Sequence, residues 1–274
     1  MPFIPLDDLT DPRLADYLGV RDPELLRRGN AFVAEGRQVV RTLLAASPLA
    51  VRSLLVTQAG LAALQDAIAP HLATVPVFVV PQEAVERLTG YNIHRGCLAI
   101  GQRPAPLSAQ SLLGLHPGAS TLVGLERVGN ADNVGAIFRN VAAFGADGVI
   151  LGPGCCDPLY RKAVRVSMGA ALRVPFAVEG DWPGALRRLA AEGFTVAALT
   201  PRPGAMTIDE VAGSWESGRR LVLLAGAEGD GLSEEALGIA SLELRISMAP
   251  GVDSLNVATA TAIALHRLAA RPRA

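Results

Sequence analysis

Arg139 is the most chemically distinctive residue of the stretch LVGLERVGNADNVGAIFRNVAAFGADGVIL, residues 122–151. The stretch is typical of a strand, a polar loop, a helix capped by Asn or Asp, and a second strand. Gly135 lies four residues before Arg139, so an open backbone and a fixed cation share one helix face. Because most of the helix is apolar, we expect Arg139 to be at least half-buried and to need a partner. That partner is either Glu126 or Glu228 in a structural ion pair, or an anionic substrate.

A second polar loop follows the apolar run LVLLA, residues 221–225. It holds Glu228 among three glycines, Gly226, Gly229 and Gly231. Glycines allow a flat ligand to approach the backbone closely, and ligands of α/β sheets bind beyond the carboxyl ends of strands. A tight strand-to-helix connection capped by Ser233 explains the same residues equally well.

A third polar loop lies in ISMAPGVDSLNVATATAIAL, residues 246–265. We expect a strand to end at Met248, and Ser254 and Asn256 to open the last helix, with Ser254 as its cap. The helix is rich in alanine, which permits close packing of another backbone and suits a contact between subunits.

A glycine-rich segment, GPGCCD at 152–157, begins like a dinucleotide-binding fingerprint. Asp157 stands where the third glycine belongs, and Asp157 and Pro158 are ordinary start signals for a helix. We therefore interpret the segment as a turn and a helix cap.

Alternating helical and strand patterns predict an α/β protein with two units. The first unit, residues 1–103, holds two short helical patterns and then four strands alternating with three helices. Residues 104–119 carry three prolines and no sustained period, which predicts a linker. The second unit, residues 120–274, contains apolar strands typical of a parallel sheet covered on both faces. Those strands are expected at 122–125, 148–151, 174–178, 194–199, 221–225 and 242–246.

Composition excludes several classes of protein. The 274 residues are 50% hydrophobic and carry a formal net charge of -1, which argues against coating of nucleic acid by global attraction. The three cysteines and four histidines match no metal-ligand spacing, so we expect no metal. The N-terminus lacks the features of a signal peptide, and no apolar run approaches the roughly 18 residues of a membrane span. We expect a cytoplasmic protein without a membrane segment.

Together, the three loops resemble the motifs of the SpoU (TrmH-like) family of RNA ribose 2′-O-methyltransferases, in the SPOUT superfamily. The resemblance rests on NVGAIFR at 133–139, GAE at 226–228, GLS at 231–233, ISM at 246–248 and SLNV at 254–257. Residues 157–160 and 165–169 resemble the stretch between the family's first two motifs. The first unit resembles the family's smaller substrate-binding domain at residues 28–36 and 94–99.

The resemblance implies a fold and a cofactor. The second unit would form a deep trefoil knot, which pattern alone would not predict because knots are essentially absent from the general repertoire of folds. The knot would hold S-adenosylmethionine in a bent shape, largely through backbone groups. The implied cofactor-binding residues are Leu199, Thr200, Gly226, Ile246, Met248 and Leu255. The resemblance also implies a homodimer whose active site borrows residues across the interface.

It further assigns the active site. Arg139 would be the family's catalytic arginine, and the other polar positions would be Asn133, Glu228, Ser254 and Asn256. The implied reaction is attack of a ribose 2′-hydroxyl on the sulfonium methyl, which requires an oriented hydroxyl and removal of its proton. A guanidinium stays protonated, so we expect Arg139 to anchor an RNA phosphate or developing negative charge.

The chain departs from the family pattern at two places. Ser247 stands where the family commonly has Pro, and NVA at 140–142 replaces the more usual Thr-Ala-Asp. The first departure bears on the geometry of the knot loop, and the second on hydrogen bonding around the catalytic arginine.

Structured RNA, ribosomal or transfer RNA, is the expected partner, held by arginines whose forked groups suit phosphate. The candidates are Arg27, Arg28, Arg37, Arg41, Arg52, Arg95 and Arg165. Solvation of the surface also explains several of them.

A non-catalytic RNA-binding or ribosome-assembly protein with the same fold is the alternative, and the intact polar residues argue against it. A dinucleotide-dependent oxidoreductase fails on its missing third glycine.

Overall fold

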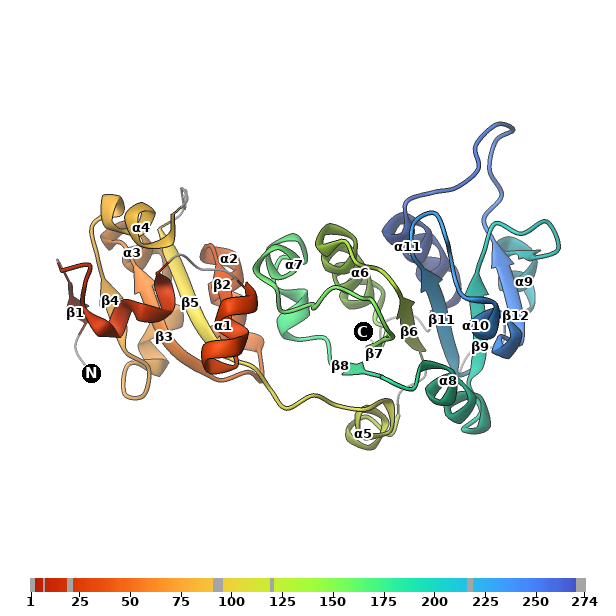
Figure 1. Cartoon of the computed structure of the whole chain (residues 1–274), viewed down its shortest axis with the longest axis horizontal. Helices are drawn as coiled ribbons and strands as arrows, with labels where there is room; N and C mark the ends of the chain where they lie inside the picture. The colour runs from red at the N-terminus through yellow and green to blue at the C-terminus, as the bar shows by residue number, and fades with distance from the viewer. Residues whose placement is uncertain are drawn as a thin grey trace. The chain divides into compact units, whose positions relative to one another are not determined.

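The computed structural model (Figure 1) describes residues 3–6, 8–18, 22–90, 96–118, 121–215 and 219–269. The chain divides into two compact units. The first consists of Met1–Ala105 and Pro158–Arg173, and the second of Pro106–Asp157 and Val174–Ala274. Both units combine helices with a sheet, as the sequence predicts.

The first unit contains, within the described residues, a mixed five-stranded sheet in the order β1-β4-β3-β5-β2. Strand β5 runs antiparallel to β3 and β2, whereas β1, β4 and β3 are parallel. The strands are β1 (Ile4–Pro5), β2 (Ala31–Glu35), β3 (Val51–Val56), β4 (Val77–Val79) and β5 (Cys97–Gln102). The helices are η1 (Pro12–Tyr17), α1 (Asp22–Gly29), α2 (Arg37–Ala46), α3 (Gln58–Ile68), η2 (Ala69–His71), α4 (Gln82–Thr89), α7 (Arg161–Val166) and η3 (Ala170–Leu172).

The second unit contains, in the part of the chain that the structure describes, a seven-stranded sheet in which every paired strand is parallel. Its order is β10-β12-β9-β11-β6-β7-β8. The strands are β6 (Thr121–Glu126), β7 (Gly148–Leu151), β8 (Phe176–Val178), β9 (Thr195–Leu199), β10 (Met206–Thr207), β11 (Leu221–Gly226) and β12 (Leu242–Arg245). The parallel sheet and its six predicted strands are confirmed. The two-residue strand β10 was not predicted.

Helices cover both faces of this sheet (Figure 1). On one face, the core joins strand residues such as Leu122 and Leu224 to α5 (Ala109–Leu115), α8 (Trp182–Ala191) and α10 (Glu234–Ile239). On the other face lie α6 (Ala131–Phe144), α9 (Ile208–Ser214) and α11 (Val257–Leu268), with α11 packed against α6, α9 and β11. None of the helices in the described ranges combines the length and the hydropathy that a membrane span requires.

Two boundaries differ from the prediction. Helix α5 lies inside the predicted linker, residues 104–119, because its apolar face is buried in the core of the second unit. Residues 158–173, predicted to belong to the second unit, belong to the first. There α7 packs against β2, and Arg161 forms an ion pair with Glu35 at 3.3 Å. A short helix whose partner strand lies more than a hundred residues earlier gives no local signal of that contact.

The glycine-rich segment at 152–157 allows the ring of Trp182 to pack closely against the backbone. A Cβ on Gly152 would lie 2.7 Å from the ring of Trp182, a buried residue of α8. The helix that follows begins at Arg161 with Tyr160 as its N-cap. The prediction that Asp157 and Pro158 start this helix was therefore wrong.

Phe138 tests the packing of α6 on the sheet. It is fully buried and meets the ring of Phe176 edge-on, with 5.9 Å between ring centroids. Phe138→Ala is expected to lower the free energy of unfolding by about 3–5 kcal/mol, measured by denaturant titration. Phe144→Ala, on the same helix but only half-buried, should cost clearly less. Equal losses would contradict this account of the core.

Candidate active site

Three polar loops meet at one edge of the parallel sheet. They follow β6, β11 and β12, whose carboxyl ends share a side because the strands are parallel. Glu126, the last residue of β6, is in register with Gly226, the last residue of β11. The loop after β12 starts at Ile246, and β12 is separated from β11 only by β9. This edge is where α/β sheets bind ligands.

Asn133, Glu228 and Asn256 form one hydrogen-bonded network across the three loops. Asn133 Nδ2 donates to Glu228 Oε1 at 2.8 Å. Asn256 Nδ2 donates to Asn133 Oδ1 at 2.8 Å and to Glu228 Oε1 at 3.1 Å. Asn133 is buried in the first turn of α6, while Glu228 and Asn256 are exposed. Three of the five predicted active-site residues thus touch one another.

Asn256 is also the N-cap of α11. Its Oδ1 accepts hydrogen bonds from the backbone N–H groups of Ala258 at 3.0 Å and Thr259 at 3.3 Å. The prediction that Ser254 caps this helix was wrong, because α11 begins at Val257 rather than at residue 255. Ser254 is an exposed residue, and its hydroxyl is not used as the cap.

Arg139 is exposed, and among the described residues it forms neither a hydrogen bond nor an ion pair. The expectation that it is partly buried was wrong. Its apolar neighbours, Val134, Ile137, Phe138 and Val141, are the fully buried ones and leave Arg139 on the solvent side. A structural ion pair with Glu126 or Glu228 is therefore excluded in this conformation. Arg139 is a cation available to a ligand.

Glu126 and Arg127 hold the glycine loop in place, and the sequence assigned neither a role in the site. Glu126 is 4% exposed, and its Oε2 accepts from the backbone N–H of Ser233 at 2.9 Å. Arg127 has a left-handed backbone with φ 57° and donates from Nη2 to the carbonyl of Gly231 at 3.2 Å. The only signal in the sequence is a charged pair directly at a strand end.

Cys155 lies beside the same strand end. Burial raises the pKa of the Cys155 thiol, and its Sγ donates to the carbonyl of Leu125 at 3.2 Å. A neutral thiol that is already hydrogen-bonded is a poor nucleophile. This agrees with a structural role.

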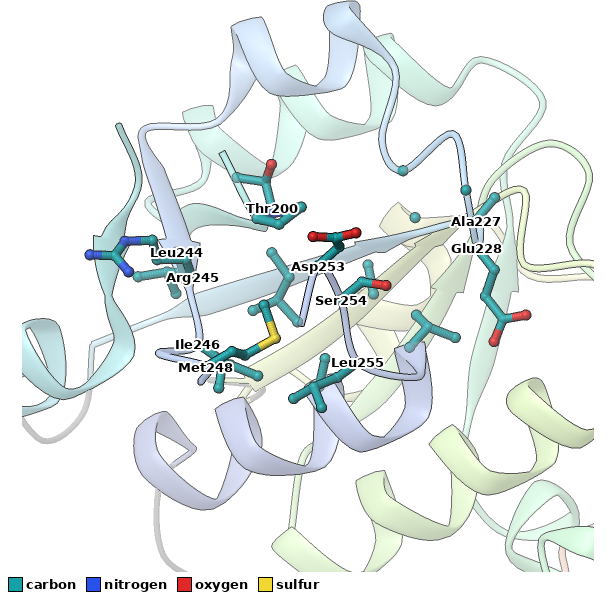
Figure 2. A pocket seen from close by; sticks show the side chains of 18 residues that line it. Thr200, Ala227, Glu228, Leu244, Arg245, Ile246, Met248, Asp253, Ser254 and Leu255 are labelled. Carbon is teal, nitrogen blue, oxygen red and sulfur yellow. The ribbon is translucent and has the colours of Figure 1, made fainter. Parts of the chain in front are cut away.

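A pocket of about 390 Å³ opens at this edge of the sheet (Figure 2). Segments after β9, β11 and β12 line it, together with the start of α11. Its lining includes every predicted cofactor-binding residue, namely Leu199, Thr200, Gly226, Ile246, Met248 and Leu255. Glu228 and Ser254 also line it, whereas Asn133, Arg139 and Asn256 do not. Glu228 therefore belongs both to the pocket and to the polar network.

Asp253 and Arg245 also line the pocket, and the sequence assigned neither a role. Figure 2 shows Asp253 and Ser254 in the middle of the pocket, while the guanidinium of Arg245 points away from it. Arg245 Nε donates to the carbonyl of Ala205 at 2.9 Å. The position of Asp253 directly before Ser254 is the one signal that could have indicated it.

Two of the predicted RNA-binding arginines have structural partners. The guanidinium of Arg41 pairs with Asp66 and donates to the carbonyl of Ala63 at 2.9 Å, which ties α2 to α3. Arg52 Nε donates to Gln102 Oε1 at 2.7 Å. These contacts within the first unit account for the presence of both arginines without a role in RNA binding.

Arg37 and Arg165 differ, because both are exposed and neither forms an ion pair with any residue in the described ranges. Arg27 is exposed as well. Arg95 and the side chain of Arg28 lie outside the described residues.

Solved structures share the fold of this protein along nearly the whole chain. An rRNA methyltransferase from Sinorhizobium meliloti has a TM-score of 0.80 at 27% identity and covers 96% of both chains. A putative RNA methyltransferase of the TrmH family from Porphyromonas gingivalis has a TM-score of 0.79 at 26% identity, covering 95% of this chain and 98% of its own. The fold is thus that of RNA methyltransferases.

The sequence comparisons give the family. Residues 120–266 match the model of the SpoU rRNA Methylase family. Over 266 residues the chain is 42% identical to an uncharacterized tRNA/rRNA methyltransferase of Mycobacterium tuberculosis, with 94% of this chain and 89% of the relative covered. The chain belongs to the SpoU rRNA methylase family.

Gly226 tests the geometry of the pocket wall. A Cβ at this position would lie 2.3 Å from the backbone carbon of Gly231, so the glycine loop would have to move. Gly226→Ala is expected to weaken binding of S-adenosylmethionine at least tenfold and to lower the melting temperature, since the cost of an overpacked site is about 1–3 kcal/mol.

Gly238→Ala is the matched control. This glycine lies in α10 with nothing within 4 Å of the added Cβ, so alanine should leave binding unchanged and stability equal or higher. Binding measured by calorimetry decides between them, and equal affinity of both variants would contradict the role given to Gly226.

Proposed function

We propose that this chain transfers the methyl group of S-adenosylmethionine to a ribose 2′-hydroxyl of structured ribosomal or transfer RNA. The observation that carries the proposal is the position of Glu228, which lines the pocket and also accepts hydrogen bonds from Asn133 and Asn256. One carboxylate therefore links a cofactor-sized cavity to a polar site beside it. A cytoplasmic location is part of the proposal.

The pocket fits the cofactor. Its volume of about 390 Å³ lies in the usual range for small-molecule sites, about 300–1,000 Å³. Apolar side chains and glycine backbone dominate its lining, as a purine bound by backbone groups requires. The S. meliloti structure with AdoMet bound has a TM-score of 0.79 with this chain at 27% identity. When bound, the cofactor supplies an electrophilic methyl group on a sulfonium.

The residues of this chain then have separate tasks. The cofactor would be enclosed by four apolar side chains, those of Leu199, Ile246, Met248 and Leu255. Backbone groups at Thr200 and Gly226 would bind it. Asn133 and Asn256 fix the carboxylate of Glu228, which leaves Oε2 to orient the attacking hydroxyl. Ser254 adds a hydroxyl inside the pocket. Arg139 stays protonated and anchors an RNA phosphate or the charge that develops on the attacking oxygen.

A trefoil knot and a homodimer belong to the same proposal. In support of the knot, the loops after β9, β11 and β12 surround one pocket, and the chain then returns from β12 to pack α11 against α6. In support of the dimer, α6 carries the exposed Arg139, and α11 carries Ile263, an apolar residue that is 37% exposed. A second copy would cover such a surface.

Arg139 is the sharpest test of the reaction. Arg139→Ala should lower methyl transfer at least a hundredfold and leave S-adenosylmethionine binding unchanged, because Arg139 does not line the pocket. The assay uses total RNA from a strain lacking the gene, and mass spectrometry of nucleosides identifies 2′-O-methyl products. Arg187→Ala is the control, since Arg187 is exposed on α8 and pairs with Glu235 at 3.4 Å.

Normal turnover of Arg139→Ala would remove Arg139 from the mechanism. A methylated base instead of a methylated ribose would overturn the proposed acceptor. RNA binding without methylation of any RNA by the unaltered chain would favour the non-catalytic alternative.

Recognition of RNA by the first unit is tested at two of its exposed arginines, Arg37 and Arg165. Arg37→Glu with Arg165→Glu should weaken binding of structured RNA at least tenfold and flatten its dependence on salt, because each cation displaces counterions. Arg41→Ala should change RNA affinity little, since Asp66 already neutralises Arg41. Filter binding across a salt series measures both. An unchanged affinity of the double variant would assign recognition elsewhere.

A further inference from the structure

Asp253 differs from Glu126 and Glu228, the two carboxylates that hold the loops of the site. Glu126 accepts a backbone N–H and Glu228 accepts two side-chain amides. Asp253 lines the same pocket, yet among the described residues no donor and no cation reaches its carboxylate. All of its acceptor capacity is therefore free, in the middle of the cavity (Figure 2).

The charge of the pocket is negative. Of the side chains that line it, Glu228, Asp253 and Arg245 are charged. The guanidinium of Arg245 points away and its Nε is engaged with the carbonyl of Ala205, so no cation of the lining offsets the carboxylate of Asp253 in the interior. Glu228 adds a second negative charge at the border of the pocket. S-adenosylmethionine carries a sulfonium, an ammonium and a carboxylate, and hence a net positive charge. Charges of opposite sign on ligand and site favour specific binding.

The chemistry of the two cations decides which one Asp253 binds. A sulfonium has no N–H to donate, whereas an ammonium has three donors that need acceptors. The methyl on sulfur must face Glu228 and its amide partners, and the apolar residues Ile246, Met248 and Leu255 suit the adenine. The amino-acid end of the cofactor is thus the part left for Asp253.

We infer that Asp253 binds the α-ammonium group of the methyl donor and makes the pocket specific for a nucleoside that carries an amino-acid tail. The inference rests on the proposed function, in that it takes this pocket as the cofactor site. Asp253 acts in binding, and the transfer step does not need it.

Asp253→Asn keeps the shape of the side chain and removes its charge. The ligands are S-adenosylmethionine, S-adenosylhomocysteine and 5′-methylthioadenosine, of which only the last lacks the ammonium. Calorimetry with the full chain should show a loss of about tenfold in affinity for the first two, equal within error. The affinity for 5′-methylthioadenosine should not change.

Two variants control the experiment. Asp230→Asn removes the same charge from an exposed residue that does not line the pocket and should leave all three affinities unchanged. Asp253→Glu keeps the charge and should retain the difference between ligands with and without the tail. Melting curves of every variant show whether it is folded, and Asp253→Ser, which also removes the charge, carries the test if Asp253→Asn does not fold.

Several results would overturn the inference. They are an unchanged affinity of Asp253→Asn for S-adenosylmethionine, an equal loss for 5′-methylthioadenosine, a loss confined to S-adenosylmethionine, or an equal loss in Asp230→Asn. If the unaltered chain binds none of the three ligands, the proposed function fails instead. The two failures are therefore distinguishable.

Discussion

The orientation of the polar side chains in the site depends on one side-chain amide, that of Asn256. Its oxygen is committed to the N-terminus of α11, so its nitrogen must point toward Asn133 Oδ1 and Glu228 Oε1. With its oxygen occupied, Asn133 can turn only its own nitrogen to Glu228. The cap of one helix thereby fixes the orientation of a carboxylate on a loop 28 residues earlier. Hydrogen bonds to a charged group contribute about 1.5–3 kcal/mol each, enough to hold three loops together.

The sequence predicts the sheet of the second unit because most of its strands are apolar runs between helical patterns. It misses β1 and β10, whose two residues each are too few to show any period. Ser254 and Asn256 are both good caps, and no local pattern decides between positions two residues apart. Burial of Arg139 was mispredicted for a related reason. An apolar helix shows which residues avoid water, but the tertiary contacts decide how wide its buried face is.

Contacts between distant parts of the chain explain the remaining features that the sequence does not predict. The ion pair of Arg41 with Asp66 spans 25 residues, and that of Arg161 with Glu35 spans 126. No composition or spacing separates these arginines from Arg37 and Arg165. Motif resemblance indicated the residues that line the pocket, yet it left out Asp253, which stands directly beside a motif residue. A motif gives positions, whereas the availability of a charged group depends on which partners the fold supplies.

Arg139 illustrates what such availability means for this site. The pocket and its border carry the carboxylates of Glu228 and Asp253, and a phosphate that approaches them meets charge of the same sign. An intramolecular ion pair would neutralise Arg139, the one cation on α6, before a phosphate could bind it. At an exposed position such a pair would add little to the stability of the fold. Leaving Arg139 without an internal partner therefore costs almost no stability, and in the proposed reaction it would keep a guanidinium free to offset the repulsion. With a net charge of -1 on the whole chain, attraction of RNA must come from local cations of this kind.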